Sequence, residues 1–228
     1  MKLLAIDSFS TILSVALSNG EVMHFTQVDA GMRQSELVMG FIDSLCKEAG
    51  LKPKDLQGVL CMEGPGSFTG LRIGYSIAKA LALSLSIPFT AIPVFDCVTR
   101  SLKDSYKNSV VLTLTDARKN AWFYAFFRDD KRLLDDGDGD YSQIINELNS
   151  FKDQGNDKII LAGPGAVTFY KAIPCDQKEN YLLKNHESGF AKELIIIARE
   201  KNIFERDNIE YLFSGPEYLR KSDAELNS

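Results

Sequence analysis

Three acidic residues each end a short apolar run, and they are the first candidates for chemistry in this sequence. These residues are Asp7, Glu63 and Asp116, and each run has the length and composition of a β-strand. In open α/β sheets, such strand ends often face a ligand crevice. For each residue the alternative is a carboxylate that is solvated or that caps a helix.

A glycine-rich turn is the second candidate. Residues 63–70 read Glu-Gly-Pro-Gly-Ser-Phe-Thr-Gly and lie between a predicted strand and a predicted helix, so Gly64, Gly66 and Ser67 could present N–H groups to a phosphate. The segment lacks the lysine of a P-loop and the glycine spacing of a dinucleotide fingerprint. A strand-to-helix corner, where glycines allow positive φ and close packing, is the alternative.

Metal and nucleophile motifs are missing from the sequence. The two histidines, His24 and His186, are far apart, and no H-E-x-x-H or Gly-x-Ser-x-Gly pattern occurs. We therefore expect neither a metal site nor a serine hydrolase. The four cysteines form no C-x-x-C pair, and no secretory signal precedes the first predicted strand, so we expect a cytoplasmic protein.

The charge balance does not favour direct binding of nucleic acid. The 228 residues include 26 basic and 31 acidic side chains, a net charge of -5, so any nucleic acid is expected to be held by another protein. The sequence also contains no membrane-span pattern. Its most apolar stretch, residues 77–87, is interrupted by Lys79, Ser84 and Ser86. That stretch is also shorter than the roughly 20 residues of a membrane span, so we expect a soluble protein with no membrane partner.

The elements that would position these residues form an α/β pattern that occurs twice. Each half opens with strands and continues with alternating strands and helices, and each contains a Gly-Pro-Gly turn. We predict one lobe over residues 1–104 and a second over 105–228. Predicted strands cover 2–7, 13–17, 22–28, 56–62, 90–92, 110–115, 121–128 and 158–162; predicted helices cover 33–49, 71–86, 94–102, 142–148, 166–172 and 189–201; residues 131–141 are predicted to be an exposed loop.

Two predicted helices carry more apolar residues than one sheet contact requires. Those of the helix over 33–49 span roughly 180° of its circumference, and those of the helix over 71–86 surround most of it. Either these helices are enclosed within the chain or a partner covers them. The predicted partner interface consists of Leu37, Val38, Phe41, Ile42, Leu45, Ile73, Ile77 and Leu81.

Four motifs, spread over nearly the whole chain, resemble the TsaB (YeaZ) family. They are the opening Met-Lys-Leu-Leu-Ala-Ile-Asp-Ser, the Gly-Pro-Gly-Ser-Phe-Thr-Gly-Leu-Arg stretch from Gly64, Asp-Ala-Arg from Asp116, and Pro-Glu-Tyr-Leu-Arg from Pro216. The resemblance implies an actin-like (ASKHA, ribonuclease H-like) fold of two lobes, with mixed sheets flanked by helices.

The resemblance also implies a function. TsaB-like proteins are non-catalytic scaffold subunits that bind and activate TsaD, which forms N6-threonylcarbamoyladenosine beside the anticodon of tRNAs reading codons that start with A. The ATPase TsaE joins the complex, tRNA is reached through the complex only, and homodimers can form through the same two helices.

The chain departs from family patterns at two places. Gln34 stands where many relatives have histidine, and the turn that contains Asp7, Ser10 and Thr11 lacks the glycine of a kinase phosphate loop. Asp7, Ser10 and Thr11, with Gly64, Gly66 and Ser67, are predicted to line a vestigial phosphate cleft. No cofactor is expected in this subunit alone, and ATP or ADP only in the assembled complex.

Two alternatives stay open at this point. One is an enzyme, either an ATP-dependent small-molecule kinase or a peptidase of the actin-like, glycoprotease-related superfamily. The other is a monomer whose apolar helices are internal and whose ligand is unrelated.

Overall fold

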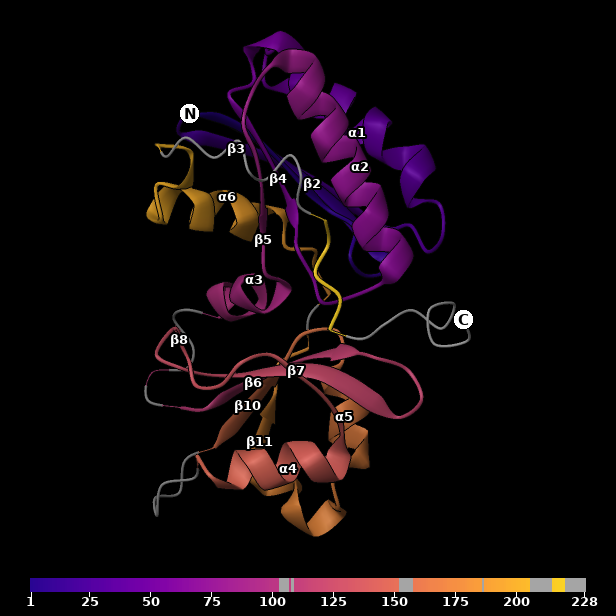
Figure 1. Cartoon of the computed structure of the whole chain (residues 1–228), viewed down its shortest axis with the longest axis vertical. Helices are drawn as coiled ribbons and strands as arrows, with labels where there is room; N and C mark the ends of the chain where they lie inside the picture. Colours follow the sequence, from indigo (N-terminus) through magenta and orange to yellow (C-terminus); the bar gives the residue numbers. More distant parts are fainter. Residues whose placement is uncertain (103–106, 108, 152–157, 186, 206–214, 220–228) are drawn as a thin grey trace. The chain divides into compact units, whose positions relative to one another are not determined.

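The computed structural model describes residues 1–102, 107, 109–151, 158–185, 187–205 and 215–219 (Figure 1). The chain divides into two compact units: unit 1 comprises Met1–Cys97 and Ser188–Glu217, and unit 2 comprises Val98–Glu187 and Tyr218–Ser228. The predicted division between residues 104 and 105 differs from these units in one main respect. The segment from Ser188, which carries the last helix, returns to unit 1.

Unit 1 is built on a five-stranded sheet. Its strands are β1 (Lys2–Asp7), β2 (Ile12–Asn19), β3 (Val22–Asp29), β4 (Gly58–Met62) and β5 (Phe89–Ile92), in the spatial order β3-β2-β1-β4-β5. β2 pairs antiparallel with β1 and β3, whereas β4 pairs parallel with β1 and β5. Gly20, with a φ of +75°, lies in the turn between β2 and β3, as the Asn-Gly pair predicted.

Helices cover both faces of this sheet. Figure 1 shows α1 (Gln34–Glu48) and α2 (Phe68–Leu85) on one side and α6 (Ala191–Glu200) on the other. Side chains alternate along a strand, so Leu4 and Ile6 of β1 join the core beneath α1 and α2. Leu3, also buried, points to the opposite side, where α6 contacts β1, β2 and β4. This apolar contact is why the last helix belongs to unit 1.

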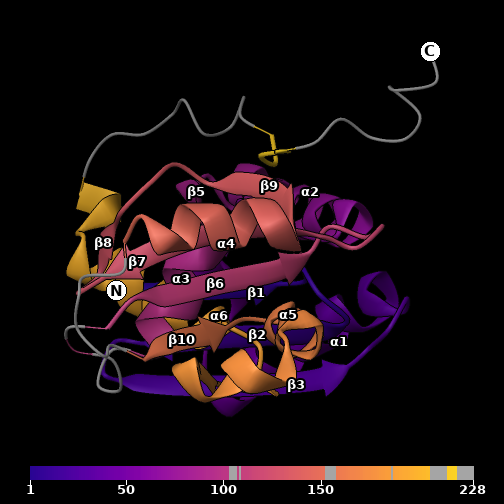
Figure 2. The same ribbon diagram turned by 90° about the horizontal axis from the view of Figure 1, so that it is seen from below.

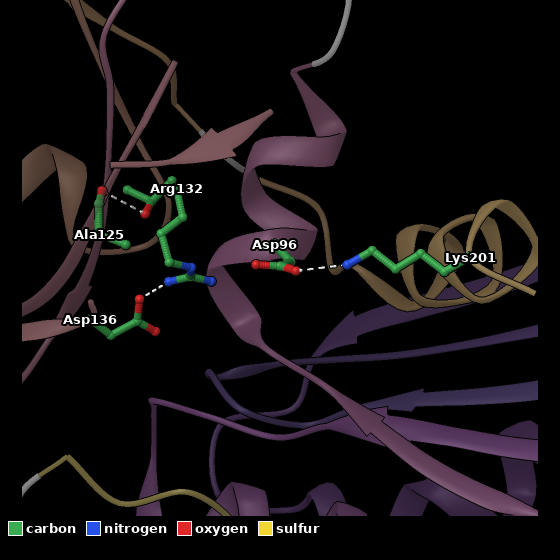
Figure 3. A network of polar contacts seen from close by, with 6 residues as sticks. Asp96, Ala125, Arg132, Asp136 and Lys201 are labelled. Carbon is green, nitrogen blue, oxygen red and sulfur yellow. Dashed lines mark hydrogen bonds and ion pairs between the residues drawn. The ribbon is translucent and has the colours of Figure 1, made fainter. Parts of the chain in front are cut away.

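Helix α3 (Val94–Ser101) follows β5, and an ion pair joins it to the residue after α6. Asp96 of α3 accepts a hydrogen bond from the ammonium of Lys201, with 3.2 Å between the nitrogen and the oxygen (Figure 3). Lys201 is well exposed, so we expect this ion pair to contribute less than about 1 kcal/mol to stability.

Unit 2 repeats the topology of unit 1. Its strands are β6 (Val111–Asp116), β7 (Ala121–Arg128), β8 (Lys131–Arg132), β9 (Gly137–Asp140), β10 (Ile159–Ala162) and β11 (Tyr181–Leu183), in the order β11-β10-β6-β7-β8 with β9 also on β7. As in unit 1, the second strand is antiparallel to the first and third, and the last two pairings are parallel. This repetition is the actin-like, ribonuclease H-like fold that was predicted.

The helices of unit 2 pack on its sheet in one layer. α4 (Tyr141–Asn149) and α5 (Ala166–Ala172) lie on the same side of the sheet (Figure 2), and their buried residues Ile144, Leu148 and Phe169 share one core with the strands. Short 3-10 turns occur at Pro53–Asp55 and Ile203–Glu205 in unit 1 and at Cys175–Asn180 in unit 2.

The prediction of an exposed loop over residues 131–141 was wrong. β8 and β9 lie there. Arg132 at the end of β8 forms an ion pair with Asp136, the residue before β9 (Figure 3). The glycines that suggested a loop instead allow close packing of a strand. A β-carbon on Gly137 would lie 2.3 Å from the ring of Tyr124 on β7.

Two smaller differences concern strand β11 and the start of α2. The sequence pattern did not predict β11, which has only three residues. α2 begins at Phe68, three residues before the predicted start, because the Ser67 side chain caps it by accepting a hydrogen bond from the N–H of Gly70. Among the described residues, no helix is both long and apolar enough to cross a membrane.

Candidate partner-binding surface

The eight predicted interface residues fall into two groups. Val38, Ile42 and Leu45 are at most 3% exposed and pack in the core of unit 1, so they hold α1 on its own sheet and are not accessible to a partner. The other five, which remain candidates for direct contact, are half-buried: Leu37, Phe41, Ile73, Ile77 and Leu81.

The half-buried residues of α1 face the edge of the sheet. Leu37 and Phe41 precede Glu48 by eleven and seven residues, which places all three on one side of the helix. Glu48 contacts His24 of the edge strand β3, with 2.9 Å between the carboxylate and Nδ1. This side of α1 therefore points toward β3.

The half-buried residues of α2 lie on the side of that helix that faces away from β5. Lys79 lies over the rings of Tyr75 and Phe89, on the side of α2 nearest β5. By helical periodicity Ile73, Ile77 and Leu81 lie on the other side of α2, toward the neighbouring helix α1.

Small and apolar residues also occupy exposed positions of both helices, beside the charged Glu36, Asp43 and Lys47 of α1. Leu83 is 63% exposed and Met39 is 50% exposed, and neither belongs to the predicted interface. Three small residues of the same helices are also exposed: Gly40 of α1, and Ser76 and Ala80 of α2. We call this set the α1–α2 surface: the half-buried Leu37, Phe41, Ile73, Ile77 and Leu81 with the exposed Met39, Gly40, Ser76, Ala80 and Leu83. The two helices thus retain an uncovered apolar face within the isolated chain.

The glycine-rich turn packs against protein backbone. Gly64 has a φ of +134°, and a β-carbon there would lie 2.5 Å from the carbonyl oxygen of Glu217. A β-carbon on Gly66 would lie 2.8 Å from the Phe9 ring, and the N–H of Ser67 donates to the carbonyl of Phe9 over 2.9 Å. These contacts favour the strand-to-helix corner over the phosphate cradle.

Asp7 is fully buried and its oxygens accept hydrogen bonds from protein groups. Oδ2 accepts from the N–H of Phe190 at 2.7 Å and from the hydroxyl of Ser14 at 3.0 Å, and Oδ1 accepts from the N–H of Phe9 at 3.3 Å. The Ser14 hydroxyl in turn accepts from the N–H of Ala191 at 3.1 Å. Of the alternatives weighed for Asp7, these contacts favour the carboxylate at a helix start, because one donor is the N–H of Phe190, the N-cap residue of α6.

Burial raises the pKa of Asp7 to about 6, against the opposing effect of its hydrogen bonds. The folded chain therefore holds this proton more tightly than the unfolded chain, in which the pKa is 3.8. Stability contributed by the protonated carboxyl is complete below pH 4 and is lost as the pH rises to about 6, by about 3 kcal/mol in all.

Asp7→Asn is expected to remove this pH dependence, because the amide does not ionise. The free energy of unfolding of the variant, relative to the parent, should rise by about 3 kcal/mol between pH 3 and pH 7. Urea unfolding of both chains across this range measures the difference. A constant difference at every pH would contradict the buried, proton-binding carboxyl.

Three other candidate residues, Ser10, Thr11 and Asp116, accept hydrogen bonds from backbone N–H groups of the chain. The Ser10 hydroxyl accepts from the N–H of Ile12 at 3.2 Å, and the carbonyl of the exposed Thr11 accepts from the N–H groups of Ala30 and Gly31. Asp116 is exposed and accepts from the N–H of Arg118 at 2.7 Å.

The backbone of Glu63 pairs with two other segments. Its N–H donates to the carbonyl of Ile92, and its carbonyl accepts from the N–H of Glu217, each over 2.9 Å. In the described part of the chain, no three His, Cys, Asp or Glu side chains are grouped so that they could hold a metal ion. Two cavities, of about 390 and 420 Å³, are lined by none of the predicted site residues.

Comparison with known proteins gives a consistent result. The model of the family described as "TsaD: tRNA N6-adenosine threonylcarbamoyltransferase" matches residues 28–182. The chain is 29% identical to the tRNA threonylcarbamoyladenosine biosynthesis protein TsaB of Buchnera aphidicola subsp. Schizaphis graminum, over 93% of each chain. It is 25% identical to TsaB of Bacillus subtilis, over 99% of this chain and 96% of that protein.

A solved structure shares the fold. YeaZ from Pseudomonas aeruginosa superposes with a TM-score of 0.76 at 18% identity, over 96% of this chain and 99% of that one.

Proposed function

Since the chain belongs to the TsaB (YeaZ) family, we propose that it is a non-catalytic subunit that binds and activates a TsaD-type threonylcarbamoyltransferase. The product is N6-threonylcarbamoyladenosine in tRNA, in line with the names of its relatives. The family model that matches this chain is itself described as the transferase, so the proposed pair consists of two related chains.

The α1–α2 surface is the observation that carries the proposal. Apolar side chains that stay half-buried or exposed on two adjacent helices are suited to a protein partner. The small residues Gly40, Ser76 and Ala80 on the outer face would let the backbone of a partner helix approach closely. A contact of standard size, ~800 Å² on each partner, would be enough for a stable complex.

The environment of Asp7 supports a role without catalysis. A kinase-type carboxylate needs free acceptor oxygens for a metal or phosphate-bound water, whereas the oxygens of Asp7 accept from Ser14, Phe9 and Phe190. The net charge of -5 supports the further proposal that tRNA reaches this subunit only through the complex.

Reconstitution tests this function. TsaD-type and TsaE-type proteins are assayed for threonylcarbamoylation of tRNA with and without this chain, and we expect activity only when the chain is added. Equal activity in its absence would contradict an activating role. Transfer by this chain alone would contradict a non-catalytic one.

The proposal extends to two further contacts. A TsaE-type ATPase is expected to join the pair, and the isolated chain is expected to form a homodimer through the α1–α2 surface, because the same apolar residues are then uncovered. Binding of the TsaD-type subunit would displace the second copy, and sedimentation of the chain with and without that subunit measures the exchange.

A further inference from the structure

All three long helices of unit 1 begin beside one turn. The turn comprises residues 8–11 and joins β1 to β2, the place where a kinase-type phosphate loop would lie. For α6, the contact is the hydrogen bond between Asp7, which precedes the turn, and the N–H of Phe190. The contacts with α1 and α2 matter more here, because these two helices carry the proposed partner-binding surface.

The start of α2 is held by two hydrogen bonds to the turn. The Ser8 hydroxyl donates to the carbonyl of Gly70 over 2.8 Å, and the N–H of Ser67 donates to the carbonyl of Phe9 over 2.9 Å. Gly70 lies so close that a β-carbon there would be 2.0 Å from the carbonyl oxygen of Ser8. The glycine-rich motif is therefore required for contact with this turn.

The start of α1 is held by Gln34. Its side chain is in the first turn of α1, the residue is 5% exposed, and its Nε2 donates to the carbonyl of Ser10. Its Oε1 would lie 3.4 Å from a β-carbon on Gly70, so the same side chain also reaches the start of α2. Gln34 thus lies between the turn and both helices.

From these contacts we infer that Gln34 is a positioning residue for partner binding, which it supports by fixing the start of α1 against the turn and against α2. The inference rests on the proposed function, since the helices concerned are those of the α1–α2 surface. Gln34 is buried and Ser10 is half-buried, so loss of the donor removes the hydrogen bond that ties the start of α1 to the Ser10 carbonyl. The start of α1 then shifts, and the spacing of the two helices changes with it.

Two substitutions at this position separate positioning from packing. Gln34→Met keeps a long side chain of similar volume but has no donor, whereas Gln34→His can donate through a ring N–H. We expect Gln34→Met to lower the affinity for a TsaD-type subunit by about 10-fold, the effect of one lost hydrogen bond. Gln34→His should stay within about 3-fold of the parent. Ser35→Ala, at the exposed neighbouring position, is the matched control and should bind as the parent does.

Hydrogen exchange of the isolated chains supplies a second readout. Gln34→Met should speed exchange of the amides of Val38, one turn into α1, and Gly74, one turn after Gly70 in α2, and Gln34→His should not. Parent-like affinity of Gln34→Met would overturn the inference, as would an equal loss of affinity in both variants. If the parent itself does not bind the TsaD-type subunit, the proposed function fails. Exchange unchanged in Gln34→Met would then overturn the positioning role as well.

Discussion

Gly40→Arg is expected to lower the affinity for a TsaD-type subunit by about 100-fold or more, while the isolated chain stays folded. Gly40 is exposed on the outer side of α1, and a β-carbon there would have nothing within 4 Å. Glycine inside a helix is less favourable than other residues by roughly 0.5–1 kcal/mol, so arginine should not destabilise α1. A partner helix packed on this glycine, however, has no room for the longer side chain.

The matched control is Asn146→Arg, an equal change of charge at an exposed position of helix α4 in unit 2. It should bind as the parent does. Titration calorimetry measures both affinities, and circular dichroism establishes that each variant is folded. Parent-like binding by Gly40→Arg would exclude the outer side of α1 from the interface.

Helical periodicity predicted that α1 and α2 carry surplus apolar surface, and the structure shows where the prediction was too broad. The sheet buries Val38, Ile42 and Leu45, whereas Leu37 and Phe41 stay half-buried. The spacing of apolar residues gives the angular position of each side chain around a helix. It does not show how much of that circumference the sheet covers. The division between core and surface therefore required the packed structure.

The strands were easier to predict than the contacts of the candidate cleft residues. An Asn-Gly turn and a run of aromatic residues are local signals, so the hairpin of β2 and β3 and strand β7 were predicted nearly to the residue. Asp7, by contrast, contacts Phe190, 183 positions away. No local pattern contains such a pair, so the sequence left open whether Asp7 faces a ligand or a helix.

The role of the glycine-rich motif could also not be settled from sequence, for the same reason. A phosphate cradle and a tight corner both need glycine, and they differ only in what occupies the space beside it. In this chain that space is filled by the backbone of Ser8 and Phe9, 62 and 57 positions before Gly70 and Gly66. The motif and the turn are therefore one structural unit.

Gly70→Ala is expected to lower the free energy of unfolding by about 3 kcal/mol or more. The new β-carbon would lie 2.0 Å from the carbonyl oxygen of Ser8, and neither side of this contact is a flexible side chain. The turn and the start of α2 must separate, which breaks the hydrogen bond from the Ser8 hydroxyl to the Gly70 carbonyl.

Gly40→Ala is the matched control, since the same atom is added to a helical glycine that has open space around it. It should raise the free energy of unfolding by roughly 0.5–1 kcal/mol. Urea unfolding of the two variants and the parent measures both changes, and their opposite signs separate close packing from helix propensity. If Gly70→Ala also stabilised the chain, the contact between α2 and the turn would be too loose to position a helix.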